Sequence, residues 1–164
     1  MRKLILILVL FVFLLATSCK KLPTYPDVPI LEYKSLTFSQ DADGNDEKFT
    51  LTATFTDGDG DVGYRESGNG AVFDSSSSPY YNNFVVTLSI LRNNVWQDTV
   101  FTISNRIPYL TPEGPHKALK ATIDKTDDLP FIGTATIRFS AFIYDRALHK
   151  SNVITTPAFT VNTP

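Results

Sequence analysis

The chain has 164 residues, of which 43% are hydrophobic, and its 15 basic and 17 acidic side chains give a formal net charge of −2. This mildly acidic balance, with lysines and arginines scattered along the chain, argues against a nucleic-acid partner. The chain contains one cysteine, Cys19, which has no partner for a disulfide within the chain. A fold built from this sequence therefore depends on packing alone.

The N-terminal segment is a hydrophobic run with a basic start. Arg2 and Lys3 precede unbroken apolar residues over 4–16, and small residues lead from there to Cys19. A run of about 13 apolar residues is too short to span a bilayer but suits the core of a secretory signal. The small residues before the cysteine resemble the lipobox of bacterial lipoproteins, which implies cleavage before Cys19 and a lipid on its thiol. An ordinary cleaved signal that ends near a cysteine is the alternative.

These features divide the chain into three parts. We expect a signal peptide over residues 1–18, the lipidated Cys19 with a Pro-rich tether over 19–29, and one domain over 30–164. The tether reaches about 30 Å at most when extended at about 3.1 Å per residue. The sequence therefore predicts a cell-envelope protein held close to the outer membrane by its lipid, on the periplasmic or the surface face.

Hydrophobic and polar residues alternate through much of the domain. In residues 48–56, Phe49, Leu51 and Phe55 fall on one face and threonines on the other, and residues 134–144 repeat the scheme around Phe139. Such alternation predicts strands with one buried and one solvated face. Further strands are expected over residues 31–39, 84–91, 95–103, 119–123 and 153–161, with a tight hairpin turn at Asn93-Asn94 and no helix after the signal.

About seven short strands joined by turns rich in Gly, Pro, Asn and Asp predict an all-β fold, an immunoglobulin-like antiparallel β-sandwich. In such a sandwich alternate connections lie at opposite ends. Residues 57–83, 104–116 and 145–152 should share one end, which we call the loop pole. Residues 41–47, the Asn93-Asn94 turn and residues 124–130 should lie at the opposite pole. The first loop of the loop pole is unusually long, which is typical of functional or disordered loops.

Asp57, Asp59 and Asp61 alternate with glycines in the sequence TDGDGDVG, which starts at Thr56. Such a loop can bend so that several carboxylate oxygens face one point, as Ca²⁺ with its roughly 6–8 oxygen ligands requires. Asp145 follows a predicted strand at the same pole and can supply a further ligand. The alternative is a structural turn, because Asp-Gly repeats are strong turn formers. Ca²⁺ is thus a candidate ligand, and no cofactor is required.

Two segments carry a resemblance to known proteins. They are FTDGDGDVG, starting at Phe55, and YDRALHKSN, starting at Tyr144. Together with the lipobox, they are similar to segments of small Bacteroidota-type lipoproteins that have a single Ig-like domain. The resemblance implies the fold and the envelope location. It implies no activity, because that group has no common function.

Four tyrosines, Tyr64, Tyr80, Tyr81 and Tyr109, fall in loops of the loop pole. Exposed tyrosines can stack on sugars or anchor a protein partner. The alternative is that they fold back over the open end of the sandwich.

The acidic residues of segment 41–47 and Asp127-Asp128 are interpreted as turns.

Catalysis has little support in the sequence. The two histidines, His116 and His149, lie in polar loops, and neither G-x-S-x-G nor H-E-x-x-H occurs. The sequence therefore predicts a non-enzymatic, lipid-anchored protein that recognises a protein or glycan through the loop pole. The alternative is a structural or accessory subunit whose sheet faces pair with a larger envelope complex.

Overall fold

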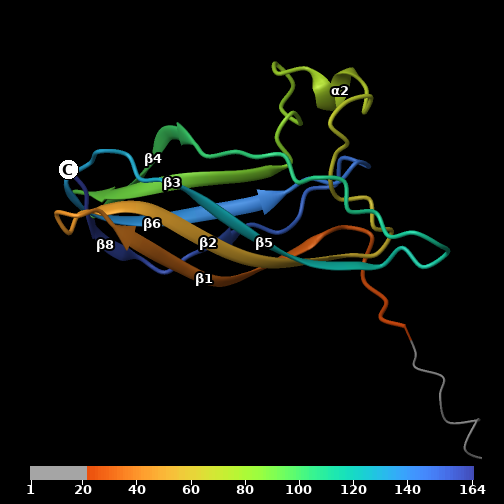
Figure 1. The fold of residues 1–164 in the computed structure, drawn as a ribbon, viewed down its shortest axis with the longest axis horizontal. Helices are drawn as coiled ribbons and strands as arrows, with labels where there is room; N and C mark the ends of the chain where they lie inside the picture. The colour runs from red at the N-terminus through yellow and green to blue at the C-terminus, as the bar shows by residue number, and fades with distance from the viewer. Residues whose placement is uncertain (1–21) are drawn as a thin grey trace, which may run out of the picture.

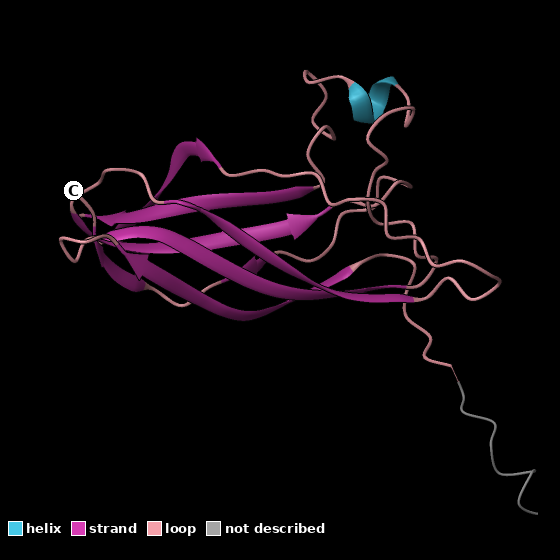
Figure 2. Cartoon of the chain, viewed as in Figure 1, coloured by secondary structure: helices cyan, strands magenta, loops and turns pink. Residues whose placement is uncertain are grey.

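The computed structural model describes residues 22–164 apart from the side chains of residues 100–102, so the predicted signal peptide and Cys19 lie outside the described residues. The regular secondary structure is almost entirely antiparallel β strand, joined by long loops as Figure 2 shows, and includes one four-residue helix, α2 (Ala71–Asp74). This single turn was not predicted, because it is too short to leave a helical period in the sequence. Within residues 22–164, no helix has the length and apolar character needed to cross a membrane.

Two sheets form a β-sandwich, which confirms the predicted fold class (Figure 1). One sheet has the strand order β1-β2-β5, and the other has the order β4-β3-β6-β7 with β8 also paired to β6. In an immunoglobulin constant domain the fourth strand pairs with the fifth, whereas here β4 pairs with β3. The strands are β1 (Ile30–Gln40), β2 (Asp46–Asp57), β3 (Phe84–Arg92), β4 (Val95–Thr102), β5 (Leu119–Asp128), β6 (Thr134–Ile143), β7 (Ile154–Thr155) and β8 (Phe159–Asn162).

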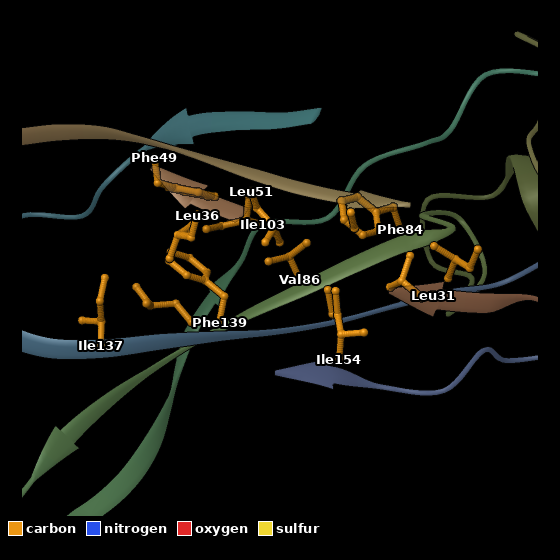
Figure 3. Packing of buried hydrophobic residues seen from close by; sticks show 14 of the residues in the cluster. Leu31, Leu36, Phe49, Leu51, Phe84, Val86, Ile103, Ile137, Phe139 and Ile154 are labelled. Atoms are coloured by element: carbon orange, nitrogen blue, oxygen red, sulfur yellow. The ribbon is translucent and has the colours of Figure 1, made fainter. Parts of the chain in front are cut away.

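The core follows the alternation predicted for β2 and β6. Phe49 and Phe55 of β2 are buried, as is Phe139 of β6, whereas Thr52 lies on the outer face of its sheet. The rings of Phe49 and Phe139 stack between the two sheets with centroids 4.4 Å apart (Figure 3). Burial of these large apolar side chains is the main force that holds the sheets together.

The predicted loop over residues 124–130 is wrong in its first part, because β5 continues to Asp128. Its charged residues pair across to β2 instead of forming a turn: Thr52 Oγ1 donates to Asp124 Oδ1 over 2.6 Å, and Lys48 forms an ion pair with Asp128. Lys125 is buried on this edge strand and lies 2.9 Å from Asp127. An inward-pointing charge on an edge strand disfavours pairing with another chain.

The last predicted strand, residues 153–161, is divided into β7 and β8. The break falls at Thr156 and Pro157, where Pro157 has no N–H for the ladder. Thr156 Oγ1 instead accepts the Phe139 N–H over 3.1 Å. The hairpin prediction is confirmed, since Asn93 and Asn94 have φ values of 50° and 61°, as a type I′ turn requires.

Candidate functional site

The three loops of the loop pole meet at one end of the sandwich, as predicted (Figure 1). Val62 forms an isolated β-bridge with Asp145, and Tyr64 forms one with Pro108. The Tyr64 N–H also donates to the Ile107 carbonyl over 2.9 Å. The long loop is therefore attached at its base to both other loops, while its outer part, with α2, projects from the sandwich.

Two glycines of TDGDGDVG allow other segments to approach this loop closely. A Cβ atom on Gly60 would lie 2.0 Å from the Lys117 carbonyl oxygen, and one on Gly63 would lie 2.0 Å from the Pro108 carbonyl oxygen. Both glycines have positive φ, 65° and 97°, which residues with a side chain rarely adopt. Packing and backbone conformation thus explain why glycines occupy these positions. They do not explain the three aspartates of the same segment.

The three aspartates of the loop converge. One carboxylate oxygen from each of Asp57, Asp59 and Asp61 lies within 4.8 Å of the other two. Asp57 is fully buried, Asp61 is half-buried and Asp59 is exposed. Asp57 Oδ2 accepts the Asp61 N–H over 2.8 Å. The Oδ1 atoms of Asp57 and Asp61 are buried and have no hydrogen-bond partner among residues 22–164.

Burial and like charge perturb these carboxyl groups. Removal from water raises the pKa of Asp57 to about 7, and the charges of Asp59, Asp61 and Asp145 act in the same direction. Desolvation also raises the pKa of Asp61, followed by the charges of Asp145 and Asp59. The fully ionised cluster is therefore unfavourable by itself, and it is stabilised by a proton or a cation.

Asp145, the fourth predicted ligand, is buried beside this cluster but is not one of its members. Its Oδ1 accepts the His149 N–H over 2.7 Å, and its Oδ2 lies 2.9 Å from Nδ1 of the same histidine. The hydrogen bond with Asp145 raises the pKa of His149. The Asp145 carboxylate thus fixes the turn over residues 145–149, and its charge adds to the negative field around Asp57.

Three of the four tyrosines pack against neighbouring side chains. Tyr64 is buried and Tyr81 is half-buried, and the guanidinium of Arg106 lies 4.9 Å and 4.8 Å from their ring centroids. Arg106 also donates to the Tyr81 carbonyl over 2.9 Å. Tyr80 packs edge-on against Tyr144, with ring centroids 5.0 Å apart. These contacts hold the long loop in place and fix the positions of the three rings.

Tyr109 differs from the other three because 38% of it is exposed. Two guanidinium groups flank its ring, with Arg65 4.1 Å and Arg146 4.7 Å from the centroid. Arg146 is held in turn, since it donates to the Gly63 carbonyl over 2.8 Å and to Thr111 Oγ1 over 2.7 Å. The result is a positioned surface cluster of one aromatic and two cationic side chains, which we call the Tyr109 cluster.

Part of the predicted tether packs against the loop pole. The Gly58 N–H donates to the Pro26 carbonyl over 2.7 Å, and a Cβ atom on Gly58 would lie 2.3 Å from the Tyr25 carbonyl oxygen. Leu22 and Tyr25 line a pocket together with Lys117 of a neighbouring loop. The chain therefore enters the domain at the loop pole, as Figure 1 shows.

The acidic segment at the opposite pole forms the predicted turn. Asp41 Oδ1 accepts the N–H groups of Asp43 and Asn45 over 2.9 Å and 2.8 Å, and its Oδ2 accepts from the Asn45 amide over 3.1 Å. Both oxygens of Asp41 are thus hydrogen-bonded. The acidic segments at the two poles thus have similar compositions but differ in how their carboxylate oxygens are hydrogen-bonded.

The arginines of the loop pole were not singled out by sequence reasoning. Arg65, Arg106 and Arg146 lie in three separate loops, and only the fold brings each of them onto a tyrosine ring.

Comparisons of the chain with protein-family models, with curated proteins and with solved structures gave no match. Function is therefore argued from the site itself.

Proposed function

We propose that this is a lipid-anchored, non-enzymatic envelope protein that binds a protein or glycan through its loop pole. The Tyr109 cluster is the observation that carries the proposal. Tyrosine and arginine are enriched at the energetic centres of protein interfaces, where rigid side chains bind with little loss of entropy. The hydrogen bonds of Arg146 to Gly63 and Thr111 supply that rigidity before any partner arrives.

The position of the tether supports a partner close to the membrane. Because residues 25–27 lie against Gly58, only the few residues between Cys19 and Tyr25 separate the predicted anchor from the loop pole. At about 3.1 Å per extended residue this distance is roughly 20 Å at most. The Tyr109 cluster would then face the membrane surface and whatever protein or glycan lies there.

Site-specific photocrosslinking in intact envelopes tests this function. A photoreactive phenylalanine analogue at position 109 should give a defined adduct, and Arg65→Ala should remove it. The control is the same analogue at Phe131, which is 83% exposed away from the loop pole. Adducts of equal yield at both positions, or an adduct at position 109 that Arg65→Ala leaves unchanged, would contradict the proposal.

The anchor has its own test. Wild-type protein should incorporate a radiolabelled fatty acid, and Cys19→Ser should give an unlabelled product that is unprocessed or soluble. Two or three acyl chains, at about 0.8 kcal/mol per buried CH₂, hold a protein on a membrane where a single chain does not. If the wild-type protein takes up no label, the lipid anchor is refuted. The crosslinking result would then test the binding function without the anchor.

A structural or accessory subunit is the second candidate, and one surface favours it. Phe142 and Tyr144 lie next to each other near the end of β6, with ring centroids 5.2 Å apart and Lys150 Nζ 3.9 Å from the Phe142 ring centroid. On the same sheet, Arg138 lies 4.3 Å from the centroid of Trp96. Such half-buried aromatic rings on a sheet face can be covered by another protein. The photoreactive analogue at Phe142 distinguishes the two candidates, since this one predicts adducts there and none at position 109.

A further inference from the structure

Buried oxygens without hydrogen-bond partners are concentrated in and directly after the TDGDGDVG segment, residues 56–63, which we call the aspartate loop. Four buried side-chain atoms lack a partner within residues 22–164, and three of them are oxygens of Asp57, Asp61 and Tyr64. The fourth is the amide nitrogen of Asn83, at the end of the same long loop. Native proteins hold few such atoms, and a bound water or ion is a common partner for them. Three oxygens within eight residues therefore point to a ligand.

A structural turn accounts for only part of this arrangement. A turn needs the glycines and one side-chain acceptor, and Asp57 Oδ2 fills the second role by accepting the Asp61 N–H. It needs neither the second oxygen of Asp57 nor two more carboxylates within 4.8 Å. The turn at Asp41 shows the difference, since both of its oxygens accept N–H groups. The extra carboxylates of the aspartate loop remain to be explained.

We propose that Asp57, Asp59 and Asp61 bind one Ca²⁺ ion. The donor set consists of carboxylate oxygens only, which suits a hard cation and does not suit Zn²⁺ or copper, whose protein sites use histidine or cysteine. Loop ligands of unequal burial favour Ca²⁺ over Mg²⁺, because Mg²⁺ requires a near-ideal octahedron and loses water reluctantly. Water from the exposed side of Asp59 would complete the coordination. Asp145 lies outside the set, since His149 occupies both of its oxygens.

This site does not depend on the proposed binding function. Three carboxylates on a partly open loop correspond to a Kd of about 0.1–1 mM, the range of extracellular Ca²⁺ modules. At roughly 10 mM Ca²⁺ the ion is then about 10 to 100 times above Kd. Mass action predicts a melting temperature about 4–8 °C higher than in chelator.

The test uses the detergent-solubilised full-length protein, with melting curves in chelator and in Ca²⁺ and with calorimetric titration of Ca²⁺. Wild type should show the shift and bind one ion. Asp59→Asn should lose both, and it should still fold because Asp59 is exposed. Asp43→Asn, in the turn at the opposite pole, is the matched control and should behave as wild type. Mg²⁺ at the same concentration should give a clearly smaller shift.

Three results would overturn the proposal. Wild-type protein without a Ca²⁺-dependent shift and without calorimetric binding has no such site. A shift of equal size in Asp59→Asn would place the ion elsewhere on the protein. An equal response to Mg²⁺ would mean that the loop is a non-selective acidic patch. The adduct expected at position 109 is measured separately and can form without the cation, so the two proposals fail separately.

Discussion

Replacement of Gly60 by alanine should damage the fold far more than replacement of Gly68, although both residues have positive φ, 65° and 80°. An alanine in the left-handed region costs about 1–2 kcal/mol, and the smaller entropy of its unfolded chain offsets about 0.4–1 kcal/mol of this. At Gly68 nothing described lies within 4 Å of the added Cβ. Gly68→Ala should therefore lower the free energy of unfolding by about 1 kcal/mol or less.

Gly60→Ala carries the same conformational cost and a steric one. Its Cβ would lie 2.0 Å from the Lys117 carbonyl oxygen, and Cβ atoms essentially never come within 3.0 Å of a heavy atom outside their own and the adjacent residues. Since the obstacle is backbone, one loop must move away from the other, at a total cost of about 3 kcal/mol or more. Urea unfolding in chelator, followed by circular dichroism, measures both variants. Equal losses would refute the close approach of the aspartate loop to Lys117.

Two further predictions concern the core and the pH dependence. Phe139→Ala should lower the free energy of unfolding by about 3–5 kcal/mol, because it leaves a cavity between the sheets, whereas Thr52→Ala on the outer face should cost about 1 kcal/mol or less. Equal values from urea unfolding would mean that the faces of the sheets are assigned incorrectly. In chelator, the protein should melt at a higher temperature near pH 5.5 than near pH 8, because a pKa of Asp57 raised to about 7 lets the native state bind a proton that the unfolded state releases. His149 acts in the same direction, since its raised pKa stabilises the native state below its folded pKa and the effect is lost as the pH rises. Asp57→Asn should flatten this profile, and an unchanged profile would show that Asp57 stays ionised.

The sandwich could be predicted because β2 and most of β6 alternate regularly between core and solvent. Phe49, Phe55 and Phe139 each occupy the buried face that the alternation requires. The second half of β5 could not be predicted, because its charges are typical of a turn when the chain is considered alone. They become favourable in a strand only beside β2, where Thr52 and Lys48 meet Asp124 and Asp128. Cross-strand pairing is a tertiary effect that local patterns do not contain.

The candidate site was predictable to a similar degree. The spacing of Asp57, Asp59 and Asp61 is local, so their convergence follows from a single bent loop. The environment of Asp145 depends instead on the turn that brings His149 to both of its oxygens. The positions of Tyr64, Tyr81 and Tyr109 depend on arginines from other loops. Sequence reasoning thus located the pole and its acidic loop but could not decide which side chains face solvent there.

The aspartate loop links the two candidate sites. The Arg146 N–H donates to the Asp61 carbonyl over 3.3 Å, and its guanidinium donates to the Gly63 carbonyl over 2.8 Å, so one loop holds this arginine from two sides. Arg146 in turn lies against the ring of Tyr109. A cation that relieves repulsion between the carboxylates should therefore also order the Tyr109 cluster, because a positioned side chain loses less entropy on binding. The adduct at position 109 should then decrease in chelator, and an unchanged yield would show that the cation site and the recognition surface act independently.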